Sequence, residues 1–181
     1  MILLILGLAL WFGAHVWKRV AIDHRASFGD KGKKIVVVAS LVAIVLMVIG
    51  YRSADGIVFW GRNGAATGIN NLLMIFAFYL FAASGKSTRI TCWIRHPQLT
   101  AVLVWSLAHL LVNGATQSFV LFGGLGFWAV AEMAIINRAT GQRGTYHAPP
   151  IKSEVIAVVA TLVVFSIAAA IHIWLGYNLF G

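Results

Sequence analysis

The side chains best suited to chemistry in this sequence are histidines that lie in strongly apolar stretches. His15 follows Trp11 by four residues and precedes Arg19 by four, so the three side chains share one face of a helix. An imidazole beside an aromatic wall suits a flat, apolar cofactor such as haem, whose iron accepts a histidine nitrogen. We therefore interpret Trp11, His15 and Arg19 as candidate cofactor-binding residues.

His109 repeats this pattern, with Trp105 four residues before it and Asn113 four residues after it. Two such histidines in one small protein favour a pair of metal ligands, so we predict that His15 and His109 bind one haem iron. The alternative is structural, because a histidine in an apolar helix can simply hydrogen-bond a neighbouring helix, which is worth about 1 kcal/mol. The sequence leaves both interpretations open for each histidine.

A haem also carries two propionates, which need cationic partners. Basic side chains that lie near the predicted inner surface of the membrane are Lys18, Arg19, Lys34 and Arg95. Arg95 and His96 stand directly before Pro97, which is well placed in a first helical turn because its missing N–H would be unpaired there anyway. We predict a polar gate at this point that helps to bind the cofactor, and the alternative is an ordinary interfacial helix start.

Two further ionisable residues lie within the apolar stretches. His172 follows Ala168 and precedes Gly176, and this face of small residues favours close helix packing over ligand binding. Glu132 could orient a histidine, but we expect it to form an ion pair with Arg138.

The composition shows which class of structure must position these residues. Of the 181 residues, 60% are hydrophobic and only 10% are charged, and the mean hydropathy is +0.88. A soluble domain is about 45–50% apolar and about 25% charged, so the natural surroundings of this chain are the lipid bilayer. The single cysteine, Cys92, excludes an intramolecular disulfide and a multi-cysteine metal site.

Six apolar stretches are long enough, or nearly so, to cross a bilayer, which takes about 17–25 helical residues. They run from Ile2 to Trp17, Ile35 to Tyr51, Ala65 to Ala83, Pro97 to Val112, Ser118 to Ile136 and Val155 to Leu175. The first has no basic residues ahead of it and no small-residue cleavage site after it, so we expect an uncleaved helix. The prediction is an all-α, polytopic membrane helical bundle of about six transmembrane helices, forming a single domain over residues 1–181.

The orientation follows from the positive charges of the loops. Only Arg52 and Arg62 follow the second stretch, whereas the loops after the first, third and fifth hold twelve basic residues: Lys18, Arg19, Arg25, Lys31, Lys33, Lys34, Lys86, Arg89, Arg95, Arg138, Arg143 and Lys152. The positive-inside rule then places these three loops in the cytoplasm and both termini outside. It also accounts for the net charge of +9 without a nucleic-acid partner.

Several motifs resemble the NnrU family of bacterial membrane proteins. They are Arg95-His96-Pro97-Gln98-Leu99-Thr100-Ala101, Trp105, Ala108-His109-Leu110-Leu111, Asn113-Gly114, Gly13-Ala14-His15, Gly29-Asp30-Lys31-Gly32 and Gly123-Gly124-Leu125-Gly126. The resemblance covers nearly the whole chain. It implies a multi-pass protein of the bacterial inner membrane with a link to nitrite and nitric oxide metabolism in denitrifying bacteria.

The resemblance also extends to a haem b enzyme, 15-cis-zeta-carotene isomerase, whose haem ligands match His15 and His109. These relatives bear a further histidine pair in the fifth helix, where this chain has Phe127 to Ala131. The implied activities are redox or sensing chemistry with nitrogen oxides, or isomerisation of a lipophilic small molecule.

Two alternatives from other classes remain open. One is a non-enzymatic membrane factor that binds a partner or moves a small solute. The other is a membrane methyltransferase, since such enzymes also carry Arg-His-Pro at a helix start; their aromatic residue two positions later is Leu99 here, and paired acidic residues near the last helices are missing. The sequence identifies neither the substrate nor the oligomeric state.

Overall fold

The computed structural model describes residues 1–141, 149–177 and 179, and these residues form an all-α helical bundle, as predicted. Arg143, counted above among the cytoplasmic charges, lies outside the described residues. The long apolar helices are α1 (Ile2–Val20), α3 (Gly29–Arg52), α4 (Gly64–Ser84), α6 (Pro97–Val112), α8 (Gly124–Thr140) and α9 (Ile151–Trp174). A short α7 (Thr116–Ser118) and a π-helical turn, η1 (Phe119–Gly123), extend α8 at its beginning.

Five segments of the described chain are long and apolar enough to cross a membrane: α1, α3, α4, α9 and the continuous run Thr116–Thr140. The sixth apolar helix, α6, has 16 residues and is slightly shorter than a usual span. Leu41 on α3 and Val163 on α9 are 59% and 52% exposed, as expected where lipid covers them. The chain is a multi-pass membrane protein.

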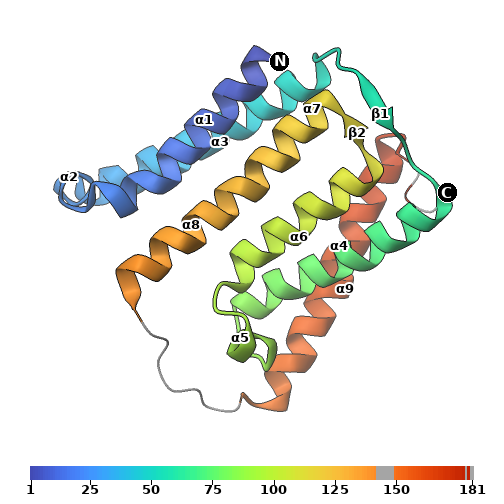
Figure 1. Cartoon of the computed structure of the whole chain (residues 1–181). Helices are drawn as coiled ribbons and strands as arrows, with labels where there is room; N and C mark the ends of the chain where they lie inside the picture. The colour runs from blue at the N-terminus through green and yellow to red at the C-terminus, as the bar shows by residue number, and fades with distance from the viewer. Residues whose placement is uncertain (142–148, 178, 180–181) are drawn as a thin grey trace.

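The helices pack in a consistent order that differs from their order in the sequence. α1 packs against α3 on one side and α8 on the other, followed by α6, α4 and α9. In Figure 1 the short connecting helices α2 (Ile22–Ser27) and α5 (Ile90–Trp93) lie at one end of the bundle, and both chain termini lie at the other. The apolar helices therefore run alternately up and down, as the loop charges predicted.

Glycines allow α1 and α3 to approach closely. A Cβ atom on Gly50 would lie 2.2 Å from the backbone nitrogen of Leu4, and one on Gly7 would lie 2.8 Å from the carbonyl oxygen of Ala43. Both distances are too short for any side chain. The α1–α3 pair is thus a tight unit, and Leu8 on its other face reaches the core cluster with Leu125 of α8.

A small feature that the sequence did not predict closes the end of the bundle at the termini. Strand β1 (Val58–Trp60) pairs antiparallel with β2 (Gly114–Ala115). The indole N–H of Trp60 donates to the carbonyl of Leu110 at 3.1 Å, and its ring covers Gly114 so closely that a Cβ there would lie 2.3 Å away. The loop after α3 thereby ties α3 to the α6–α7 connection.

Candidate functional site

Two cavities with common walls lie inside the bundle. The first, which we call the polar cavity, has a volume of about 570 Å³ and is lined by the ends of α1 and α4, the start of α6, and α8. The second, the apolar cavity, has about 500 Å³ and lies mainly among α4, α6, α8 and α9. The residues that line both are Trp11, Phe81, Val102 and Trp128. Together the two cavities suit a molecule with an apolar body and a charged end.

His15 lines the polar cavity in a defined orientation. Its Nδ1 lies 2.9 Å from the carbonyl oxygen of Trp11. Because a carbonyl can only accept, Nδ1 carries the proton, and the lone pair of Nε2 is left available. This arrangement is typical of metal-bound histidines, in which a backbone carbonyl fixes the tautomer.

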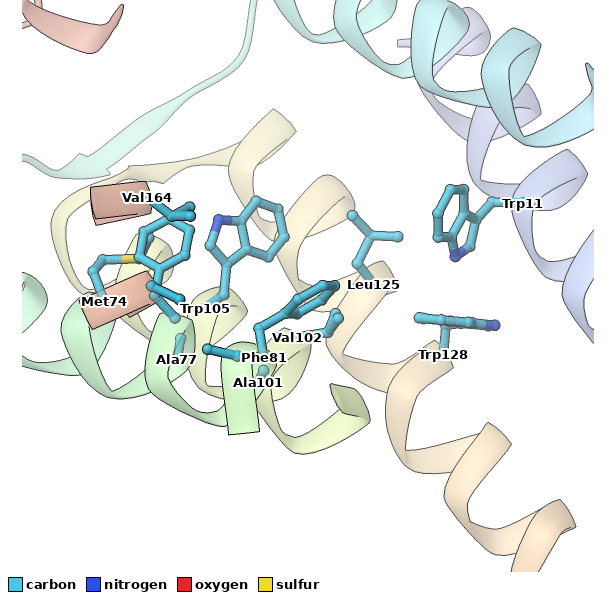
Figure 2. Close-up of a pocket in the computed structure, with 13 residues that line it drawn as sticks. Trp11, Met74, Ala77, Phe81, Ala101, Val102, Trp105, Leu125, Trp128 and Val164 are labelled. Carbon is cyan, nitrogen blue, oxygen red and sulfur yellow. The ribbon is translucent and has the colours of Figure 1, made fainter. Parts of the chain in front are cut away.

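Two indole rings surround the His15 imidazole. The ring centroid of Trp11 lies 4.2 Å from that of His15, and the ring of Trp128 packs edge-on against both of them at 5.4 Å and 5.0 Å. Figure 2 shows the two indoles close together, from α1 and α8, at one end of the apolar cavity. Both indole N–H groups are buried without a partner among the described residues. Since buried donors are normally paired, these two suit a ligand that carries acceptor oxygens.

The polar cavity is predominantly cationic. Lys18, Arg19 and Arg95 line it, together with one acid, Glu132. Glu132 is 3% exposed, and its Oε1 accepts from Nε of Arg19 at 3.1 Å, while its Oε2 has no partner. The expected pairing of Glu132 with Arg138 is therefore wrong, because α8 turns this carboxylate toward α1 and away from its own C-terminal turn.

The predicted polar gate is fastened to the end of α8. Nε2 of His96 donates to Oδ1 of Asn137 at 2.9 Å, and Nη2 of Arg95 donates to Oγ1 of Thr140 at 2.8 Å. Both His96 and Arg95 line the polar cavity. These contacts fix the start of α6 beside the last turn of α8 and hold a cationic group at the mouth of the cavity.

His109 lies elsewhere. Its ring stacks on Phe122 at 4.6 Å and meets Trp105 edge-on at 5.0 Å. It lines a third, small cavity together with His172, whereas Trp105 lines the apolar cavity. Twelve residues separate His109 from the start of α6, which is about 18 Å along the helix axis. The structure thus brings together Trp11, His15, Arg19, Arg95 and His96, and does not bring His109 to the same cavity; the shared ligation stays a prediction.

The polar cavity has the side chains and the volume that would fit a b-type haem held by a single histidine. His15 presents a free Nε2, cationic side chains are available for propionates, and the volume lies in the usual range for such ligands, about 300–1,000 Å³. Among the described residues, no three His, Cys, Asp or Glu side chains group to hold a bare metal ion.

Sequence reasoning overlooked Trp128 as part of this site. The pattern was available, because Trp128 precedes Glu132 by four residues, the same spacing that singled out Trp11 and His15. The spacing alone does not show which neighbouring helix packs against this face of α8.

Comparison with known proteins gives one clear result. A family model described as NnrU protein matches residues 3–179. Searches of the curated proteins and of the solved structures found no significant match.

Proposed function

The chain belongs to the NnrU family, and on that basis we propose that it is a haem-binding protein of the bacterial inner membrane, with b-type haem ligated by His15. The observation that carries this proposal is the orientation of His15, whose Nδ1–H is held by the Trp11 carbonyl inside a cationic cavity of sufficient size. Lys18, Arg19 and Arg95 would receive the propionates. Haem would supply a redox-active iron that can bind small nitrogen oxides.

The adjoining apolar cavity supports a second activity at the same site. Its lining is almost wholly hydrocarbon and aromatic, from Met74 and Phe78 on α4 to Trp105 on α6. A lipophilic molecule dissolved in the bilayer would lie there with one end at the Trp11–Trp128 pair. Isomerisation of such a molecule is the candidate reaction, beside sensing of nitrogen oxides.

The experiment is a visible spectrum of the detergent-purified protein from cells supplied with ample haem precursor. We expect a Soret band that shifts on reduction, and a loss of haem content of about tenfold or more in His15→Ala. His24→Ala is the matched control, because His24 is exposed, its ring packs on Trp17 and Phe28, and it lines neither of the two cavities. A colourless, stable wild-type preparation would instead indicate a non-enzymatic membrane protein that binds a partner or moves a small solute.

His109→Ala tests whether the iron has a second histidine ligand. If His15 and His109 share the iron, this variant changes the spectrum of the reduced protein as strongly as His15→Ala does. If His15 is the only histidine ligand, the Soret band of His109→Ala remains. A wild-type Soret band in His15→Ala would contradict the proposed site itself.

A further inference from the structure

The small cavity that contains His109 is a separate candidate site. It lies among α4, α6 and α9 and has a volume of about 30 Å³, enough for one water molecule or one ion. Its side chains with donor atoms are Asn70, Asn71, Met74, His109 and His172. We call it the His109–His172 cavity. None of its donors lines the polar cavity that holds His15, and the inference rests on the form of the proposed function in which His15 is the only histidine ligand of the haem.

Both imidazoles in this cavity have a nitrogen free for coordination. Nδ1 of His172 donates to the carbonyl oxygen of Ala168 at 2.7 Å, so its Nε2 keeps an available lone pair. The ring of His109 makes no hydrogen bond to any residue that the structure describes; it is held by stacking on Phe122. The stacking fixes the orientation of the His109 ring, and its nitrogens have no hydrogen-bond partner among the described residues.

Asn70 provides an independent indication of a ligand. Its side chain is only 3% exposed, and its Nδ2 donates to Oδ1 of Asn71 at 3.2 Å. The carbonyl oxygen of Asn70, Oδ1, is buried and has no partner in the described part of the chain. Burying such an oxygen without a partner costs free energy, and either a donor or a cation would offset that cost.

The remaining donor, Met74, decides which cation fits. Met74 follows Asn70 by four residues, on the same face of α4, and contributes a thioether sulfur. Thioethers select soft metals, and imidazoles also bind copper. All donors here are neutral, and no acid lines the cavity. A divalent ion would therefore leave two uncompensated charges in a low-dielectric region, whereas a monovalent ion leaves one.

From this donor set we infer that the His109–His172 cavity binds a single copper(I) ion through His109, His172 and Met74, with Asn70 Oδ1 nearby. The site lies at the end of the bundle that carries the termini, away from the polar cavity. It thus gives the molecule a second metal centre, on the far side of the apolar cavity from His15. Met74 lines both the His109–His172 cavity and the apolar cavity.

The test is an anaerobic titration of the detergent-purified full chain with copper(I) in competition with bicinchoninate. We expect one copper(I) per chain, and binding weakened by tenfold or more in Met74→Leu, a swap of similar volume that conserves packing. Met133→Leu is the matched control, because Met133 on α8 lies near Thr100 and outside this cavity. X-ray absorption should show sulfur and nitrogen neighbours of copper in the wild type and nitrogen alone in Met74→Leu.

The two metal proposals can fail independently. We expect His15→Ala to lose haem and retain copper(I), and Met74→Leu to bind copper(I) tenfold or more weakly and retain haem. Copper(I) binding that is absent in the wild type, or unchanged in both Met74→Leu and His172→Ala, overturns the copper site whatever the haem spectrum shows. In that case a single water molecule is the occupant that satisfies Asn70.

Discussion

At the scale of single residues, the Arg19–Glu132 pair is the polar contact that joins α1 to α8. The two residues are 113 positions apart in the sequence, and Glu132 is almost wholly buried. Breaking a buried ion pair by removing one partner is costly because the remaining charge is left without compensation, whereas replacing both partners by apolar residues often costs little.

The Arg19 side chain is 35% exposed, so solvent partly screens this pair. We therefore expect Arg19→Met to destabilise the protein by about 1–2 kcal/mol, less than the loss of a partner in a fully buried pair. The double variant Arg19→Met/Glu132→Leu should recover most of that loss, because it leaves no buried charge. The measurement is the thermal midpoint of both variants and the wild type in one detergent. A double variant that is no more stable than Arg19→Met would contradict this account of the pair.

The Arg19–Glu132 pair also separates what the sequence could predict about this site from what it could not. Trp11, His15 and Arg19 could be grouped from the sequence because their four-residue spacing depends only on helix geometry. The partner of Glu132 could not be predicted, because it depends on which face α8 turns toward α1. The separation of His15 from His109 was equally out of reach, since it depends on the position of α6, which packs on α8 as α1 does.

At the scale of elements, the helices themselves were predictable and the connections were not. The apolar stretches mark six helices because the bilayer demands long apolar segments, yet α3 begins at Gly29, six residues before the predicted Ile35. The polar start of α3 continues the helix beyond the apolar stretch, which hydropathy does not register. Strands β1 and β2 were missed because Val58–Trp60 and Gly114–Ala115 pair only once α3 and α6 are in place.

The close packing of α1 on α3 gives a prediction about glycines. Gly50→Ala would force a Cβ against the backbone of Leu4, so we expect a loss of about 2 kcal/mol or more. Gly13→Ala, on the same pair, meets no atom within 4 Å and should leave stability unchanged or raise it by up to about 1 kcal/mol. The thermal midpoint should fall in Gly50→Ala and stay the same or rise in Gly13→Ala. Equal losses in the two variants would contradict the close contact of α1 and α3.

At the scale of the whole molecule, the up-and-down order of the helices makes the predicted orientation testable. Ser27 is the last residue of α2, which lies at the end of the bundle with the basic loops, and Gly61 directly follows β1, which lies at the opposite end (Figure 1). In a Cys92→Ser background, we expect Gly61→Cys to react with a membrane-impermeant maleimide on intact spheroplasts, and Ser27→Cys to react only after lysis. Labelling of Ser27→Cys alone on intact spheroplasts would reverse the orientation.

The π-helical turn at Phe119–Gly123 has a consequence for how the length of this segment can vary. Before this turn, the chain comes from the connection between α6 and α7. Within the turn, Phe122 stacks on the ring of His109. After the turn, Trp128 and Glu132 contact His15 and Arg19 of α1. Each residue advances a helix by about 100°. A one-residue deletion within the α-helical part, between Gly124 and Trp128, would swing the residues downstream by more than a quarter of a revolution, dissociating the indole from His15 and the carboxylate from Arg19. The π-helical turn holds one residue more than an α-helical turn, so a deletion at Phe119–Gly123 can be absorbed by an α-helical turn without that rotation. We therefore expect this turn to tolerate the loss of one residue better than the rest of the span.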